Sequence, residues 1–98
     1  MRDPATLADM TDLRTEIDDT DAQLCALLGH RARLISRAAQ LKEENGWPAR
    51  IDGRVEEVID NVRRFAEAEG WDADLAEKLW RELVEWSIRR EQVALGRE

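Results

Sequence analysis

The longest periodic stretch of apolar positions runs from Thr11 to Glu44. Apolar side chains recur there at helical spacing, without proline and with Gly29 as the only glycine. The apolar positions are Leu13, Ile17, Leu24, Leu27, Leu28, Leu34, Ile35, Ala38 and Leu41. This spacing predicts one long helix, with Thr11 as its N-cap and Asn45-Gly46 as its stop.

The predicted length of this helix has a consequence for assembly. A helix of about 34 residues is about 50 Å long at ~1.5 Å per residue, whereas a compact domain of about 100 residues has a radius of gyration of only about 13 Å. The helix therefore extends beyond any core that its own chain can build. Either its end is solvated or a second chain covers it, and the continuation of the apolar stripe nearly to Leu41 favours the second chain.

Two shorter helices are predicted after a loop at residues 45–53, where Asn-Gly, Pro48 and Gly53 all interrupt helices. Asp52 is predicted to cap the second helix, which runs to about residue 69 before Gly70. Its apolar face is Val55, Val58, Ile59, Val62, Phe65 and Ala66. The pattern therefore gives an all-α fold of three helices, preceded by a flexible leader at residues 1–10.

The third helix is predicted to begin after an Asp72 cap and to run to about Leu95. Its apolar residues, expected to face inward or an interface, are Leu75, Leu79, Trp80, Leu83, Trp86 and Val93. Residues 1–98 are enough for one domain with a modest core. The loop residue Trp47 is expected to pack on the bundle, with closure over a ligand as the alternative.

Composition supports helices and narrows the partners. The chain has no Tyr, one Phe and little β-branched content, which is typical of an all-helical protein. Its formal net charge of −7 argues against nucleic acid or an anionic membrane as the main partner. The single cysteine, Cys25, excludes an intrachain disulfide and a cysteine metal site, and we expect it to be buried in a protein of the reducing cytoplasm. The start of the chain lacks the apolar region of a signal peptide.

Few kinds of chemistry fit these residues. The lone His30 has no evident partner and is expected to be exposed, and no catalytic triad, metal-ligand spacing or glycine-rich phosphate loop occurs. What remains is a set of cations on apolar helices, with Ser87 and Glu91 one turn apart on the last helix. Such a set can bind a small dianion and can catalyse by positioning and electrostatics, without a metal or cofactor. The alternative is a solvated surface whose cations pair with glutamates.

Three of the cations, Arg14, Arg31 and Lys42, lie on the long helix. At ~100° per residue, Arg31 and Lys42 lie within about 20° of each other around the helix and share a face. Arg14 lies about 100° away from Arg31 around the helix. In a dimer of crossed long helices, Arg14 could complete the site of the other chain.

The segment LRTEIDDTDAQLCALLGHRARLISRAAQLK resembles the first helix of the all-helical chorismate mutase family. The family pattern is L-R-x-x-I-D-x-x-D-x-x-L-x-x-L-L-x-x-R, followed by a Lys eleven residues later. The matching residues are Arg14, Ile17, Asp18, Asp21, Leu24, Leu27, Leu28, Arg31 and Lys42. Pro48 and Arg54 fall at the family's loop proline and second-helix arginine, and Ser87 and Glu91 fit its last helix. The resemblance implies an intertwined, domain-swapped homodimer with two equivalent sites.

The resemblance also implies a role for each cation. Arg14 of one chain and Arg31 of the other would clamp the two carboxylates of the substrate, because the planar fork of Arg matches a carboxylate. Arg54 would add charge near the enolpyruvyl carboxylate. Lys42 would donate to the ether oxygen of the breaking C–O bond, where negative charge grows. The implied reaction is the rearrangement of chorismate to prephenate in aromatic amino acid biosynthesis, with no cofactor.

Three positions depart from the family pattern. Val55 stands where the family commonly has an acidic residue that contacts the ring hydroxyl of the substrate. Ile51 stands at the place of a usual Asp, with Asp52 shifted by one. Glu91 stands at the place of a usual Gln, and because an ionised Glu cannot donate a hydrogen bond, we predict that Glu91 acts as the neutral acid.

These departures leave other activities open. The segment GRVEEVIDNVRRFAEAEGWDADLAEKLWRELVEW is similar to part of the isochorismate-pyruvate lyases, which share this fold and its cations. A mutase of 4-amino-4-deoxychorismate is another possibility, in which Asp52 or Glu56 would face the substrate amine. A third, of another class, is a weakly active helical interaction module that needs a partner enzyme.

Overall fold

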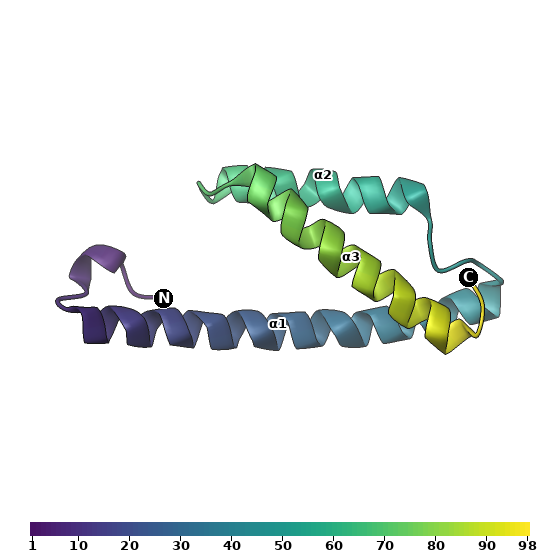
Figure 1. Cartoon of the computed structure of the whole chain (residues 1–98), viewed down its shortest axis with the longest axis horizontal. Helices are drawn as coiled ribbons and strands as arrows, with labels where there is room; N and C mark the ends of the chain where they lie inside the picture. Colours follow the sequence, from purple (N-terminus) through teal and green to yellow (C-terminus); the bar gives the residue numbers. More distant parts are fainter. The chain divides into compact units, whose positions relative to one another are not determined.

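A computed structural model describes all 98 residues, and it contains helices and no strand. The elements are a short 3₁₀ helix, η1 (Pro4–Thr6), and three α-helices, α1 (Met10–Asn45), α2 (Asp52–Ala68) and α3 (Ala73–Leu95) (Figure 1). The predicted all-α fold with one very long helix is confirmed. The chain divides into two compact units, Met1–Arg33 and Leu34–Glu98, which are described separately.

The segment at residues 1–10, for which a flexible leader is predicted, contains the 3₁₀ helix η1. The side chain of Asp3 accepts a hydrogen bond from the backbone of Ala5 and caps η1. The backbone N–H of Arg2 donates to Oε1 of Glu16 at 3.0 Å.

The helix α1 begins one residue before Thr11, so the prediction of Thr11 as its N-cap is wrong. Asp9 takes this role, because its Oδ1 accepts from the backbone N–H of Asp12 at 2.8 Å. The predicted end is confirmed: α1 stops at Asn45, and Gly46 adopts a positive φ of 71° that favours glycine.

The apolar stripe of α1 is largely exposed within this chain, and Ala39 is the only buried residue of the helix. The exposed apolar residues of α1 include Ile17, Leu24, Leu27, Leu28, Leu34 and Leu41. Cys25 is also exposed, so its predicted burial is wrong for the single chain. His30 is exposed, as predicted.

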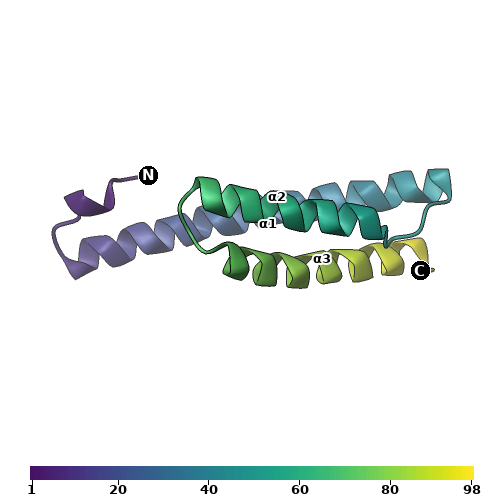
Figure 2. The ribbon, with the colours of Figure 1, turned by 90° about the horizontal axis from the view of Figure 1, so that it is seen from above.

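In the second unit, α2 and α3 pack side by side and run in opposite directions (Figures 1 and 2). Ala66 and Ala76 are both 0% exposed, which lets the two helices approach closely. Gly70 turns the chain between them with a φ of 75°. Asp72 then caps α3 as predicted, because its Oδ1 accepts from the backbone N–H groups of Asp74 at 2.9 Å and Leu75 at 3.0 Å.

The predicted cap of α2 is wrong. Asp52 lies inside its first turn, and Ile51 is the N-cap residue without any side-chain cap. Asp52 still places negative charge near the positive end of the helix dipole. Phe65, which belongs to the apolar face of this helix, is 62% exposed in the single chain.

The residues that α3 buries within its own chain lie outside the predicted apolar set, which was expected to face inward or an interface. Its buried residues are Ala76, Val84, Ser87, Ile88 and Glu91. Four large apolar residues expected to face inward or an interface are exposed in the chain: Leu75, Leu79, Trp86 and Val93. The close approach to α2 uses the small and β-branched residues, and this leaves the larger ones on another face of the helix. No helix has the length and apolar character needed to cross a membrane.

Candidate active site

Lys42 and Glu91 meet in the second unit, although they are far apart in the sequence. Lys42 lies in the last turn of α1, and Glu91 lies on the buried face of α3. The Nζ atom of Lys42 is 3.0 Å from Oε1 of Glu91, and their side chains are only 16% and 5% exposed. A charged pair this enclosed requires good geometry to offset the loss of hydration.

The carboxylate of Glu91 is not fully satisfied by this ion pair. Its Oε1 is buried and has no hydrogen-bond partner in the chain, because the approach of Lys42 meets the distance of an ion pair without the geometry of a hydrogen bond. A buried oxygen without a donor is costly for an ionised carboxylate. Oε1 of Glu91 is therefore open to a hydrogen bond from a bound molecule.

The ammonium of Lys42 makes its hydrogen bond to the loop. Nζ donates to the backbone oxygen of Ala49 at 2.7 Å. Ala49 is 2% exposed and forms a small core with Val84 and Ile88 of α3. The cation is therefore held between the loop and α3.

Ser87 and Val55 lie beside this small core. Ser87 is 3% exposed, and its hydroxyl donates to the backbone oxygen of Leu83 at 2.9 Å. Val55 is half-buried and packs against the core that contains Ala49 and Val84. An aliphatic side chain therefore stands where an acidic residue is usual in the family that the chain resembles.

Two further predicted site residues lie on the exposed first turns of α2. Arg54 donates to Glu57, one turn further along the same helix. Asp52 is exposed as well. Neither makes a hydrogen bond or ion pair with Lys42 or Glu91, so the chain brings together only part of the predicted set.

Arg14 and Arg31 belong to the first unit, Met1–Arg33. The side chain of Arg14 is exposed on α1, and that of Arg31 is half-buried. Both remain predicted substrate-binding residues.

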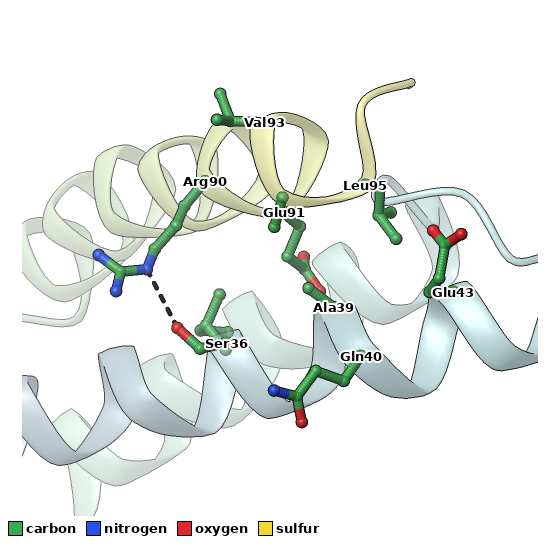
Figure 3. Close-up of a pocket in the computed structure, with 10 residues that line it drawn as sticks. Ser36, Ala39, Gln40, Glu43, Arg90, Glu91, Val93 and Leu95 are labelled. Carbon is green, nitrogen blue, oxygen red and sulfur yellow. Dashed lines mark hydrogen bonds between the residues drawn. The ribbon is translucent and has the colours of Figure 1, made fainter.

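A groove of about 470 Å³ lies between the C-terminal half of α1 and the end of α3, and Glu91 forms part of its wall (Figure 3). Nε of Arg90 donates to the hydroxyl of Ser36 at 3.3 Å across this groove, and its guanidinium lies 5.2 Å from the ring centroid of Trp86. In Figure 3, Glu91 points from α3 toward Ala39 on α1. The volume is in the range of small-molecule sites.

A surface ion pair joins the loop to α3. Arg50 donates to Oε2 of Glu85 at 2.6 Å. This hydrogen bond lowers the pKa of Glu85 and raises the pKa of Arg50. The loop is therefore attached to α3 both through the buried Ala49 and through an exposed charge pair.

Ala49 is the site residue that sequence reasoning missed. Ala49 contributes a backbone oxygen, which every residue type has. A pattern of side chains therefore cannot predict this contact. The only indication in the sequence was the position of Ala49 directly after Pro48, in the loop that follows Lys42 and the end of the long helix. The side chain of Trp47 is 54% exposed, so its predicted packing on the bundle is wrong for the single chain.

Comparison with known proteins relates most of the sequence to one family. The family model described as chorismate mutase type II matches residues 13–92. The isochorismate pyruvate lyase of Pseudomonas aeruginosa is 30% identical over 99 aligned residues, which cover 100% of this chain and 95% of that protein. The chorismate mutase of Methanocaldococcus jannaschii is 24% identical over 78% of this chain and 77% of its own length.

Larger proteins also contain a similar region. The T-protein of Enterobacter agglomerans is 32% identical over 85 residues, which cover 87% of this chain but 23% of that protein. The chain thus spans less than a quarter of the length of this relative.

Proposed function

The chain belongs to the chorismate mutase type II family, and from this premise we propose that it acts as a chorismate mutase whose residues 1–98 form one helical domain. The reaction is the pericyclic rearrangement of chorismate to prephenate. The observation that carries this proposal is the enclosed ammonium of Lys42, which is fixed between the oxygen of Ala49 and the carboxylate of Glu91.

Lys42 supplies the electrostatic part of the mechanism. An ammonium has three N–H donors, and Ala49 takes one of them. Another is free to donate to the ether oxygen as the C–O bond breaks and negative charge grows there. A donor held in place in a partly dehydrated site stabilises that charge without reorganising during the reaction.

The arginines supply binding and orientation. Arg31, together with Arg14 of a second chain, clamps the two carboxylates and holds the substrate in the folded conformer that reacts. Arg54 adds positive charge near the migrating fragment. Since Arg54 is exposed and paired with Glu57 in the free chain, it exchanges that partner for the substrate on binding.

Glu91 acts as a neutral acid. Only the protonated carboxyl can donate to the ether oxygen beside Lys42. Glu91 is 4% exposed and lies beside Lys42, so its carboxyl group stands where such a second donor would act. Replacement by Gln, whose amide donates a hydrogen bond without a titrating proton, is therefore expected to preserve activity.

The active form is a homodimer. The exposed apolar residues of α1, such as Leu24 and Leu28, and of α3, such as Leu79 and Trp86, form the surface that a second copy covers. Exposed apolar surface on this scale marks an interaction site. The dimer would also bring Arg14 of each chain to the site of the other.

A lyase acting on isochorismate is the second candidate, and Val55 is the observation that favours it. An aliphatic, half-buried side chain cannot accept a hydrogen bond from the ring hydroxyl of chorismate. The lyase relative also aligns over 95% of its own length, unlike the much longer T-protein. The same cations would then bind isochorismate, and the enzyme would cleave it to salicylate and pyruvate.

The deciding experiment is a parallel assay of the purified protein with chorismate and with isochorismate at about pH 5 and about pH 7.5, with products separated by chromatography. Prephenate formed faster at the lower pH supports the mutase and the neutral Glu91. Salicylate and pyruvate support the lyase. Absence of all three products, with the helical circular dichroism signal intact, would overturn both candidates and favour an interaction module or the amino-substrate mutase.

A further inference from the structure

We infer that Ala49 and the backbone of Glu98 act together as positioning residues for Lys42, so that the loop between α1 and α2 is a fixed strap. The inference rests on the proposed catalytic role of Lys42. It adds a part of the chain, the segment after α3, that no predicted site residue includes.

The first link of this arrangement is the direction of the ammonium. The hydrogen bond from Nζ of Lys42 to the oxygen of Ala49 is 2.7 Å long, which is typical of a strong, charge-assisted bond. A lysine side chain has four rotatable bonds, and without this acceptor the ion pair with Glu91 would be the remaining polar restraint on its ammonium. Ala49 therefore decides where the remaining N–H donors point.

The second link is the immobility of Ala49 itself. It is 2% exposed and packs with Val84 and Ile88, while Leu95 contacts the same small core. A larger side chain would not fit there without displacing the loop. The methyl group of Ala49 thus fixes the backbone oxygen that holds Lys42.

The third link comes from the end of the chain. The backbone N–H of Ala49 donates to the backbone oxygen of Glu98 at 3.2 Å. Both backbone polar groups of Ala49 are therefore used, one by Lys42 and one by Glu98. Because Ala49 is buried, losing the Glu98 acceptor would leave its N–H unsatisfied or draw the loop outward.

The fourth link aims the terminal segment at the loop. Gly96 ends α3 with a positive φ of 67°, and the N–H of Arg97 donates to the backbone oxygen of Gln92 at 3.2 Å. This is the hydrogen-bond pattern of a Schellman cap, which reverses the chain after a helix. Glu98 is thereby returned to the loop, and in Figures 1 and 2 the C-terminus lies beside the segment that joins α1 to α2.

These links form one connected path from the end of α3 through the loop to the ammonium. The exposed ion pair of Arg50 and Glu85 attaches the same loop to α3 a second time. The contacts oppose a loop that opens and closes over the site. The expected function of the strap is to keep Lys42 oriented before substrate arrives.

The test compares two variants that lose the same side chains. One is the chain with Arg97 and Glu98 deleted, and the other is the double substitution Arg97→Ala/Glu98→Ala, which keeps the backbone oxygen of residue 98. If the strap positions Lys42, the deletion lowers kcat by roughly tenfold with little change in KM, because a misplaced donor weakens transition-state stabilisation more than binding. The double substitution is expected to retain kcat within about twofold of the parent chain.

A second measurement is independent of turnover. Amide hydrogen exchange at Ala49 is expected to be slow in the parent chain and in the double-alanine variant, and at least roughly tenfold faster in the deletion variant. A third variant, Ala49→Gly, keeps both backbone groups but loosens the packing. It is expected to lower kcat by a smaller factor than the deletion does.

The outcomes separate the strap from the proposed function. An active parent chain whose kcat is unchanged by the deletion would overturn the positioning role alone. Unchanged exchange at Ala49 in the deletion variant would overturn the strap even if kcat fell. A parent chain that converts neither chorismate nor isochorismate would overturn the proposed function, and with it the catalytic meaning of the strap, whatever the exchange data show.

Discussion

The hairpin of α2 and α3 buries three and five residues respectively, whereas α1, which is longer than either, buries only Ala39. Small buried residues such as Ala66 and Ala76 lie where α2 packs against α3. Ion pairs connect charged side chains on the polar surface of this hairpin. Along α1, leucines that follow the same helical periodicity remain exposed. Amphipathic pattern therefore predicts that a helix has an apolar face, but not whether its own chain covers that face.

Lys42 differs from the exposed leucines of α1 because it is enclosed by other parts of the chain. It is a charged side chain, yet it is only 16% exposed, and it joins α1 to the loop and to α3. Lys42 is thus the residue of α1 that contacts both the loop and α3 in the candidate site.

The largest expected effect follows from removing this residue. Replacement Lys42→Met is predicted to lower kcat by about 10²–10³-fold, the usual consequence of losing one preorganised donor in the transition state. Steady-state kinetics on the substrate identified by the parallel assay would measure it.

Lys78 is the matched control for that substitution, because it is the other lysine of the chain and lies exposed on α3. Lys78→Met is predicted to change kcat by less than about twofold. Equal losses from both substitutions would show that Lys42 has no special role.

The next effect tests the exposed face of α1. The double substitution Leu24→Glu/Leu28→Glu is predicted to dissociate a dimer and to destabilise the protein by about 2–3 kcal/mol per chain, because the apolar area would otherwise be buried by a second copy. Sedimentation equilibrium and thermal melting would measure both consequences. Gln23→Glu, at another exposed position of the same helix, is the control. A parent chain that sediments as a monomer would contradict the dimer.

The packed hairpin is expected to be sensitive to added side-chain volume. Ala76 has 0% exposure, so Ala76→Leu is predicted to cost about 1–3 kcal/mol by overpacking. A loss of that size corresponds to a fall in melting temperature of roughly 4–8 °C per kcal/mol for a domain of this size. The exposed Ala68 of α2 provides the control, since Ala68→Leu should change stability by less than about 0.5 kcal/mol.

The smallest effect concerns the charges on the outside of the hairpin. Hydrogen bonding and charge from Arg81, followed by the charge and hydrogen bond of Arg63, lower the pKa of Glu77. A lowered pKa means that the unfolded chain binds the proton more readily, so the stabilising contribution is present above the ordinary Glu pKa of about 4.3 and is lost as the pH falls through the lower folded value. Glu77→Gln should therefore reduce the dependence of the melting temperature on pH below about 5.

The matched control for that substitution is Glu67→Gln, at an exposed position of α2 that makes no ion pair in the structure. It should alter the pH dependence less than Glu77→Gln does. An identical acid response of the two variants would show that the network around Glu77 contributes nothing measurable.

Some features of the candidate site could be predicted from the sequence, whereas the contacts between distant residues could not. Lys42 and Glu91 were both assigned to the site from the resemblance of the first and last helices to the family pattern. Their contact at 3.0 Å was not predictable from that spacing, since it depends on how α3 returns to the end of α1. Asp52 was misassigned as a cap because several polar residues near a helix start can all satisfy the same local rule.

The sequence by itself determined the helices, since periodicity and stop signals such as Gly46, Gly70 and Gly96 act within a few residues and need no distant partner. It also carried the motif of the family to which the chain belongs. Tertiary structure decided which face of α3 is buried, and it supplied Ala49 and Glu98, whose contributions are backbone atoms that all residues share. The physical reason is that a side-chain pattern records which surfaces avoid water, whereas the pairing of those surfaces depends on contacts between residues far apart in the chain.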